Sequence, residues 1–334
     1  MSTPLTDADR VHLARAVELG RRGWGRVHPN PMVGCVLVRD GEVVAEGWHG
    51  EFGGPHAETV ALEAAGPAAR GATAYVSLEP CRHEGKTPAC TRALLASGVA
   101  RVVFGAADPG AESGGGGAEL ARAGVEVVGP VFDDLEARSL NPAFHHRFAS
   151  ALPWVALKLA VSLDGRIAER EGVRTMLSGP ESAEAVHTLR AGFDAVLVGG
   201  VTGRVDDPLL TVRGGVEPRV PPVRIILDPQ ASIPSDAALF EATADVPVWV
   251  FTRDDASEAE LERLEAAGAS VHPVPAIGPH ELDLGIVLRH CAVAGVGAIL
   301  CEGGGRLASS LLNGGFIRRL YWVVVPRILG CLLY

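Results

Sequence analysis

The first fifty residues alternate hydrophobic and polar positions in a way that predicts a helix followed by a hairpin. Apolar residues recur near helical spacing after Thr6, whose hydroxyl can cap a helix N-terminus. Two valine-rich runs, 33–38 and 43–48, are short enough to be strands. They are joined by Asp40-Gly41, a dipeptide that favours a tight hairpin turn. We therefore expect an antiparallel hairpin at the start of a sheet.

The rest of the first half alternates between helical and strand patterns. That alternation implies an α/β sheet with parallel crossover connections. The glycine run Gly114–Gly117 has the composition of a flexible loop. The expected helices cover residues 56–65, 88–97, 118–123 and 133–148, and the expected strands cover residues 72–78, 101–104 and 125–128.

The second half begins at about residue 151 and repeats the same kind of alternation. Pro153 opens a new apolar strand, so we divide the chain into two α/β domains, 1–151 and 152–334. The expected strands cover residues 154–162, 195–198, 223–227, 247–251, 298–301 and 320–325, and the expected helices cover residues 180–191, 256–267, 282–294 and 306–312.

Composition and charge narrow the classes of function. The 334 residues are 47% hydrophobic and 21% charged, as in ordinary globular proteins. A net charge of −10 and the absence of long basic runs argue against nucleic acid as a partner. No apolar stretch is long enough to span a membrane, and the N-terminus lacks a signal-peptide pattern. We therefore expect a cytoplasmic protein without membrane association, whose six cysteines are thiols or metal ligands.

One histidine, one glutamate and two cysteines form the clearest chemical pattern. His56 and Glu58 lie at the start of an expected helix, Cys81 follows an expected strand, and Cys90 lies near the start of another helix. Catalytic zinc sites use three protein ligands and leave a fourth position for water, which fits one imidazole and two thiolates. Glu58 lies where a carboxylate can exchange protons with that water without binding the metal. The pattern is typical of zinc-dependent nucleobase deaminases.

These residues have two other interpretations. Taken singly, a His-x-Glu pair is usually a surface feature of a helix, and two cysteines nine residues apart are usually core or loop thiols. A structural zinc finger would need a fourth protein ligand, for which His83 is the only nearby candidate. The combined order of the four residues favours the catalytic site.

A glycine-rich turn follows an expected strand near the C-terminus. It starts at Glu302 and runs through three glycines into Arg306, a geometry in which backbone N–H groups hold phosphate. A dinucleotide fingerprint of the Rossmann type would need an acidic residue about 20 positions later. No Asp or Glu follows Glu302, so we reject the Rossmann interpretation.

The first half resembles the bifunctional deaminase/reductase family of riboflavin biosynthesis, and the resemblance continues over almost the whole chain. The long spacer CRHEGKTPAC, residues 81–90, and the segment HPNPMVGCVLV, residues 28–38, both match that family's pattern. The resemblance implies a cytidine-deaminase-like three-layer α/β/α domain followed by a dihydrofolate-reductase-like α/β domain. It also implies that His56, Cys81 and Cys90 bind Zn²⁺, that Glu58 carries protons and that Asn30 contacts the pyrimidine.

The second half matches the reductase part of the same family. KLAVSLDGR, residues 158–166, resembles its first strand, and VDDPLLTVR, residues 205–213, resembles the stretch that holds cofactor and sugar phosphate. The implied reactions are hydrolytic loss of the 2-amino group from 2,5-diamino-6-(5-phosphoribosylamino)pyrimidin-4(3H)-one and NADPH-dependent reduction of the ribosyl group to ribityl. The implied substrate contacts are Arg190, Leu210, Arg213 and Glu302, and the implied cofactor contacts are Ala160, Met176, Thr202, Asp206, Gly304, Gly305, Arg306 and Leu307.

Two departures from the family pattern concern the reductase. Residues 174–178 read RTMLS where the family usually has Ser-x-Trp-Ile-Thr, so Met176 replaces a tryptophan that stacks on the cofactor. The chain also stops soon after Gly330, where the family continues, so the reductase domain is expected to be truncated with an open sheet edge. We expect a homodimer that pairs through this domain. The alternatives are a deaminase with a degenerate or truncated reductase domain and a non-catalytic scaffold stabilised by zinc.

Overall fold

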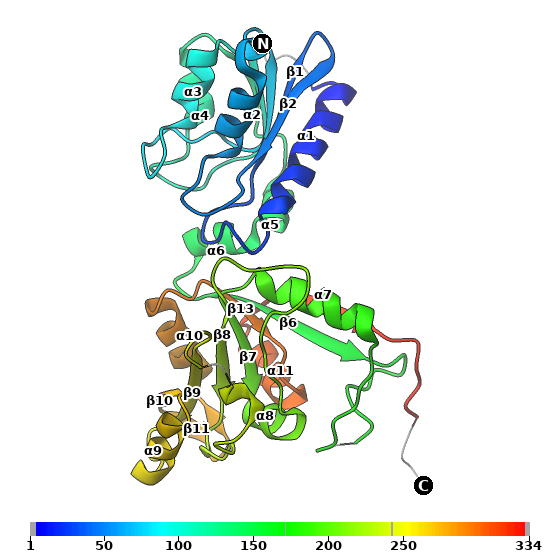
Figure 1. Ribbon diagram of the computed structural model, residues 1–334, viewed down its shortest axis with the longest axis vertical. Coiled ribbons are helices and arrows are strands. Elements are labelled where there is room, and N and C mark those ends of the chain that lie inside the picture. Colours follow the sequence, from blue (N-terminus) through cyan, green and yellow to red (C-terminus); the bar gives the residue numbers. More distant parts are fainter. Residues whose placement is uncertain (1–4, 171, 242, 331–334) are drawn as a thin grey trace. The chain divides into compact units, whose positions relative to one another are not determined.

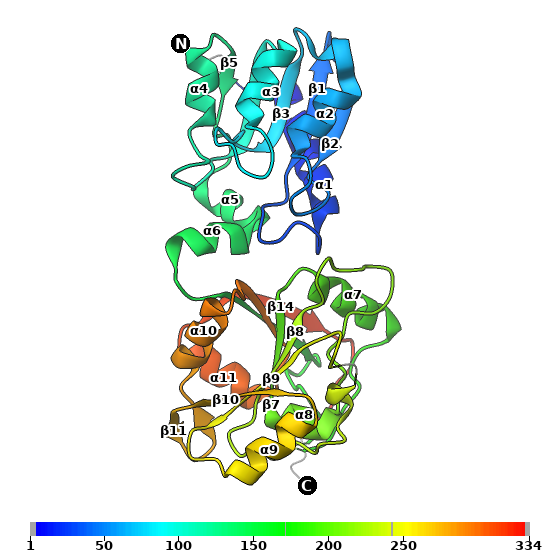
Figure 2. The same cartoon turned by 60° about the vertical axis from the view of Figure 1, so that its left-hand side comes forward.

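The chain forms two compact units, one ending at Ala149 and the other starting at Ser150. The computed structural model describes residues 5–170, 172–241 and 243–330. The break between the units lies close to the boundary expected at residue 151. Each unit is a sheet with helices packed against it (Figures 1 and 2).

The first unit is built on a five-stranded sheet with strand order β2-β1-β3-β4-β5. The expected hairpin is confirmed: β1 and β2 are antiparallel, and Asp40 and Gly41 adopt positive φ angles of 54° and 82° in the turn. β1 also pairs antiparallel with β3, whereas β3, β4 and β5 are parallel. The strands are β1 (Gly34–Arg39), β2 (Glu42–Trp48), β3 (Thr73–Leu78), β4 (Arg101–Ala106) and β5 (Glu126–Val128).

Helices cover both faces of this sheet, which confirms the expected three-layer α/β/α arrangement. Because side chains alternate along a strand, Val36 of β1 packs with the α1 residues Ala16 and Leu19. Cys35 and its neighbours on the opposite face belong to a core with residues of α2 and α3. Helices α2 and α3 lie side by side in Figure 2. The helices are α1 (Asp7–Gly20), α2 (Ala57–Ala65), α3 (Cys90–Ser97), α4 (Gly116–Arg122), α5 (Asp134–Leu140) and α6 (Pro142–Ala149), with short 3₁₀ turns at Arg21–Gly23 and Gly66–Ala69.

A buried ion pair fastens α1 to the sheet. Thr6 caps α1 as expected and forms a capping box with Asp9. The Asp9 carboxylate is only 1% exposed, and it accepts hydrogen bonds from the Tyr75 hydroxyl at 2.8 Å and from Arg101 Nη1 at 2.6 Å. The Arg101 guanidinium holds the pKa of Asp9 well below its usual range. Helix α1, β3 and β4 therefore share one charged anchor.

We expect Asp9→Ala to lower the free energy of unfolding by about 3 kcal/mol, because it leaves Arg101 and the Tyr75 hydroxyl without their buried partner. Since the folded-state pKa of Asp9 is depressed, its stabilisation is present above a pH of about 4 and is lost as the pH falls further. Urea unfolding of both proteins measures the difference. Glu126→Ala, which removes an exposed partner of Arg101, is the matched control and should cost less than about 1 kcal/mol.

The helix expected over residues 133–148 is wrong as a single element. The structure has two helices, α5 and α6, separated at Asn141, whose φ of −131° and ψ of 63° are not helical. Pro142 explains the break, because its ring lacks an N–H group and disfavours helical geometry in the residue before it. The break leaves the side chain of Asn141 free to bond elsewhere.

The flexible loop expected at Gly114–Gly117 is also wrong in part. Gly116 and Gly117 begin α4 and are buried. A Cβ added at Gly116 would lie 1.8 Å from the carbonyl oxygen of Pro80, so only glycine permits this approach. The glycines let α4 pack directly against the loop that carries Cys81.

The second unit contains a seven-stranded sheet whose neighbouring strands are all parallel. Its order is β10-β9-β8-β7-β13-β6-β14, so β13 inserts between β6 and β7. The strands are β6 (Trp154–Val161), β7 (Ala195–Gly199), β8 (Val223–Leu227), β9 (Val248–Arg253), β10 (Ser270–Val274), β13 (Ala298–Cys301) and β14 (Ile317–Val324). A small antiparallel pair, β11 (Ala276–Gly278) and β12 (Glu281–Leu282), lies outside this sheet.

Helices again lie on both faces of the second sheet. One core packs α10 and α11 against residues such as Leu197 and Ile225, and the other packs Leu264 of α9 against Val196 and Ile226. The helices are α7 (Pro180–Ala191), α8 (Gly200–Asp206), α9 (Glu258–Ala266), α10 (Leu284–Val293) and α11 (Gly305–Asn313), with a 3₁₀ turn at Ala238–Phe240. The sequence patterns did not predict α8 or β10–β12.

Strand β14 lies at one edge of the second sheet. Within the described residues it pairs only with β6. Residues 331–334, where the expected truncation falls, lie outside the described residues. Among the helices that are described, none combines the length and the apolar composition needed to cross a bilayer.

Candidate active sites

The first unit contains a cavity of about 620 Å³ that holds the residues singled out from the sequence. His56, Glu58, Cys81 and Asn30 all line it. They come from the start of α2, from the loop after β3 and from the loop before β1. The carboxyl end of a strand and the amino ends of helices therefore meet at this cavity.

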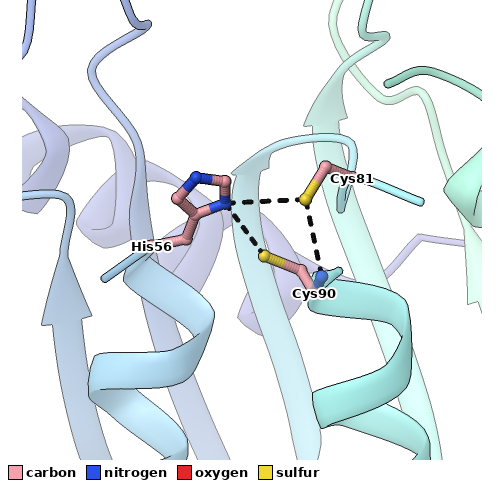
Figure 3. Close-up of side chains that lie close together, drawn as sticks. All are labelled: His56, Cys81 and Cys90. Carbon is pink, nitrogen blue, oxygen red and sulfur yellow. Dashed lines mark hydrogen bonds between the residues drawn. The ribbon is translucent and has the colours of Figure 1, made fainter. Parts of the chain in front are cut away.

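The three expected metal ligands converge at its wall, where His56 and Cys81 line the cavity and Cys90 lies buried beside them (Figure 3). The Nδ1 atom of His56 lies 3.2 Å from the Sγ atom of Cys90 and 3.5 Å from the Sγ atom of Cys81. All three candidate ligand atoms lie within 4.8 Å of one another. One imidazole nitrogen and two sulfurs at this separation are a donor set that fits Zn²⁺.

Local backbone geometry places each ligand. His56 is the N-cap residue of α2, with an extended backbone, and Cys90 is the first residue of α3. The backbone N–H of Cys90 donates a hydrogen bond to the sulfur of Cys81 at 3.4 Å. Positive charge at the amino ends of the two helices favours the thiolate forms of the cysteines.

The protonation states of the two thiols are linked. The pKa of Cys81 is lowered well below its usual range, mainly because the Cys90 thiol donates a hydrogen bond to it. The same contact raises the pKa of Cys90. The hydrogen bond with Cys81 also raises the pKa of His56. The three side chains are thus close enough for the protonation of each one to depend on the others.

Glu58 lies in the first turn of α2 beside these ligands. Its side chain is almost fully buried, at 3% exposed, and it lines the cavity. Burial raises the pKa of its carboxyl group to about 7. A carboxyl group that changes protonation near neutral pH is suited to accept and return a proton.

Asn30 is held in the cavity wall by a histidine that the sequence analysis missed. His49 is 3% exposed, and its Nδ1 lies 3.0 Å from the carbonyl oxygen of Pro55. Because a carbonyl only accepts, Nδ1 carries the proton, and Nε2 accepts a hydrogen bond from the Asn30 amide at 3.2 Å. The amide nitrogen of Asn30 therefore faces His49, and its oxygen is left for another partner.

In the second unit, two of the expected substrate residues bind each other. Arg190 donates to both carboxylate oxygens of Glu302, from Nε at 2.6 Å and from Nη2 at 3.1 Å. Its Nη1 donates to the carbonyl oxygen of Thr211 at 2.9 Å. Both side chains are 10% exposed. The pair joins the end of α7 to the turn after β13.

The glycine-rich turn before α11 contacts helix α8 and the loop after β6. The backbone N–H of Gly304 donates to the hydroxyl of Thr202 at 3.2 Å, so these two expected cofactor residues lie together. A methyl group added at Gly305 would lie 3.2 Å from the side chain of Ile167. Arg306 is exposed in the first turn of α11, and Leu307 packs against the core.

The remaining expected residues of the reductase site differ in exposure. Leu210 is 2% exposed in the core, with a positive φ of 55°. The backbone N–H of Arg213 contacts His187 at 3.2 Å. Ala160 lies on β6, and Asp206 ends α8 half-buried, where burial raises its pKa. Met176 is 66% exposed.

Comparisons with known proteins agree for both units. Residues 6–106 match the model of the cytidine and deoxycytidylate deaminase zinc-binding region. Residues 153–332, more than half of the chain, match the model of the RibD C-terminal domain. The chain belongs to the RibD family.

Relatives in the RibD family cover nearly the whole chain. The riboflavin biosynthesis protein RibD of Aquifex aeolicus is 38% identical over 98% of this chain and 89% of its own length. The RibD protein of Escherichia coli is 36% identical over 96% of this chain and 89% of its own length. Among solved structures, Acinetobacter baumannii RibD superposes with a TM-score of 0.81 at 35% identity, covering 97% of this chain and 88% of that one.

A Thermotoga maritima structure titled as a diaminohydroxyphosphoribosylaminopyrimidine deaminase/5-amino-6-(5-phosphoribosylamino)uracil reductase superposes with a TM-score of 0.80. It is 34% identical to this chain and covers 97% of it, and the match covers 88% of the Thermotoga chain. These matches confirm the expected fold, in which a cytidine-deaminase-like domain precedes the RibD reductase domain.

The cavity of the first unit is also lined by cationic residues to which the sequence motifs gave no role. Lys86 lines the cavity with its ammonium group 4.0 Å from the centre of the Phe52 ring. Arg147 of α6 also lines it, together with Phe144 and Phe148. Arg147 lies in a segment with no recognisable motif, so only its position in the folded chain reveals it.

Proposed function

We propose that this RibD-family chain carries out two successive steps of riboflavin biosynthesis, a zinc-dependent pyrimidine deamination and an NADPH-dependent reduction. The observation that carries the proposal is the convergence of His56, Cys81 and Cys90 beside the buried carboxyl of Glu58, at the wall of a cavity of about 620 Å³. The second unit matches the RibD reductase domain. The substrate class is a phosphorylated ribosylaminopyrimidine.

For the deaminase, each chain residue has a defined task. His56, Cys81 and Cys90 would hold Zn²⁺, which supplies a Lewis acid that activates water when bound. Glu58 accepts a proton from the attacking water and delivers it to the leaving amine. One water is consumed, the C–NH₂ bond breaks, and a carbonyl and ammonia are formed.

Polar and cationic residues of the cavity account for the rest of the deaminase substrate. Asn30 presents its amide oxygen to the pyrimidine, because its nitrogen is held by His49. Lys86 supplies positive charge at the cavity wall for a phosphorylated substrate. Both residues line the same cavity as the candidate metal ligands His56 and Cys81, which supports these assignments.

For the reductase, we assign the binding of the anionic substrate to two arginines and the binding of the cofactor to the glycine-rich turn. Arg190, Leu210, Arg213 and Glu302 would line the substrate, with the arginines toward the sugar phosphate. The ion pair with Glu302 fixes the orientation of the Arg190 guanidinium. Residues 304–307 and Thr202 would hold NADPH, with Ala160, Met176 and Asp206 as further contacts. NADPH supplies the hydride, so the protein supplies orientation.

We expect the reductase to prefer NADPH over NADH by at least about tenfold in kcat/KM, because the exposed Arg306 places positive charge in the first turn of α11 and no acidic residue follows Glu302 in this sequence. Arg306→Ala should reduce this preference by raising the KM for NADPH and not for NADH. Initial rates with both cofactors measure it. Equal use of the two cofactors by the unmodified enzyme would contradict the assignment of this turn.

A coupled assay tests the function as a whole. The zinc-loaded protein is given the diaminopyrimidine, and ammonia release and NADPH oxidation are followed in sequence. We expect both. Ammonia release without NADPH oxidation would mean a deaminase with a degenerate reductase domain, consistent with the exposed Met176 in place of tryptophan. The absence of both ammonia release and NADPH oxidation would indicate a non-catalytic zinc-binding scaffold.

We also propose that two copies pair through the second unit in the cytoplasm. The edge strand β14 exposes Leu320 by 47%, Trp322 by 51% and Val324 by 51%, an apolar strip suited to a second copy. Five described cysteines are free thiols, as a reducing compartment permits. Sedimentation should give a dimer, and Trp322→Glu should give a monomer. A monomeric unmodified protein would refute the pairing.

A further inference from the structure

Helices α5 and α6 lie outside both family models, which match residues 6–106 and 153–332. They nevertheless contact the loop that carries Asn30. Phe144, Arg147 and Phe148 of α6 line the deaminase cavity. The segment from Asp134 to Ala149 is thus part of the cavity wall and not only a connection between the units.

Asn141, at the break between the two helices, makes two hydrogen bonds to this loop. Its side chain is buried, at 8% exposed. Its Oδ1 accepts a hydrogen bond from the backbone N–H of Met32 at 2.7 Å, and its Nδ2 donates to the carbonyl oxygen of Met32 at 3.1 Å. One side chain therefore satisfies both polar backbone groups of a residue two positions after Asn30.

A second contact from α6 lies on the other side of Asn30. Nη1 of Arg147 donates to the carbonyl oxygen of Pro29 at 3.1 Å. The Arg147 guanidinium also lies over the rings of Phe144 and Phe148, at 4.7 and 4.8 Å from their centres. The backbone is thus held immediately before and shortly after Asn30, while His49 holds its side chain.

We propose that Asn141 is a positioning residue of the deaminase, which holds the loop of residues 29–32 so that Asn30 meets the pyrimidine. The proposal rests on the role assigned to Asn30 above. Without Asn141, the Met32 N–H loses its partner and the loop can shift. A shift on the order of 1 Å is enough to weaken a substrate contact substantially. Asn141 itself lies behind the loop and acts through it.

A double-mutant cycle on the zinc-loaded full-length protein tests this assignment. The variants are Asn30→Ala, Asn141→Ala and both together, with Arg138→Ala on the exposed face of α5 as the control. We expect Asn141→Ala to raise the KM for the diaminopyrimidine about tenfold, the loss of one to two hydrogen bonds, with zinc content retained. Because Asn141 acts through Asn30, the double variant should have nearly the KM of Asn30→Ala alone.

The outcomes of the cycle distinguish a failure of the role of Asn30 from a failure of the role of Asn141. A KM unchanged by Asn30→Ala would refute the role of Asn30 and with it this proposal. Effects of the two substitutions that multiply fully, or a KM unchanged by Asn141→Ala, would overturn only the positioning role. Loss of zinc along with activity in Asn141→Ala would also overturn it, because that marks general damage to the fold.

A conservative variant covers the case in which Asn141→Ala does not fold. Asn141→Asp has the same shape and keeps the acceptor for the Met32 N–H, but it places a carboxylate against the Met32 carbonyl. We expect its KM to lie between those of the unmodified protein and Asn30→Ala. A KM equal to that of the unmodified protein, while Asn30→Ala raises it, would overturn the positioning role.

Discussion

Replacing Glu58 by glutamine is expected to lower the deamination rate by a factor of about 10²–10⁴, the usual contribution of a general acid/base. The amide keeps the size of the carboxyl group but cannot carry a proton between the water and the leaving amine. Since Glu58 is buried beside the cysteines without belonging to the three-atom ligand set, zinc content should not change. Ammonia release and metal analysis on the same preparation measure both quantities.

A control for this experiment is available on the same helix. Glu63 lies on the exposed side of α2, and Glu63→Gln should leave the deamination rate unchanged. The reductase step, assayed with the deaminated product, should be unaffected by either substitution. If Glu58→Gln kept more than about a tenth of the rate, another group would have to carry the proton.

Replacing a metal ligand is expected to have the other large effect. The unmodified chain should bind one zinc, and Cys90→Ser should lose most of it, because two of the three protein ligands remain and a hydroxyl is a poor ligand at neutral pH. Deamination should fall by on the order of 100-fold or more. Reduction of the deaminated product should persist, because the residues assigned to it lie in the second unit.

A matched thiol distinguishes a ligand from a buried cysteine. Cys35 lies in the core of the same unit, on β1, and is outside the ligand set. Cys35→Ala should keep one zinc per chain and nearly full deamination. Full zinc content in Cys90→Ser, or equal zinc loss in both variants, would contradict the assignment of the three ligands.

Much of the local structure could be predicted from the order of the residues. The hairpin at Asp40-Gly41 formed where expected, because a two-residue turn with positive φ is determined by the residues in it. The capped start of α1 at Thr6 was likewise a local signal. The prediction of one helix over 133–148 was wrong, because the apolar pattern continues across Pro142 although the proline interrupts the helical backbone there.

The convergence of the three candidate zinc ligands could also be predicted from the sequence, whereas the residues around them could not. His56 and Cys90 lie at the starts of helices, and Cys81 lies in the loop that follows a strand. Because these loops and helix starts meet at the carboxyl ends of parallel strands, the α/β pattern brings all three residues to one edge of the sheet. Ligands that lie in short motifs can be identified from the sequence alone. Glu58 is fixed relative to His56 by one helical turn and needed no tertiary information.

The sequence by itself therefore determined the fold class, the three candidate metal ligands and the likeness to the RibD family, because helix caps, turns and ligand motifs are formed by residues close together in the chain. The tertiary structure alone decided that Asn141 bonds Met32, that Arg190 pairs with Glu302 and that His49 orients Asn30. The first two pairs are 109 and 112 residues apart. Such hydrogen bonds depend on where two distant segments pack, and neither periodicity nor motif spacing carries that information.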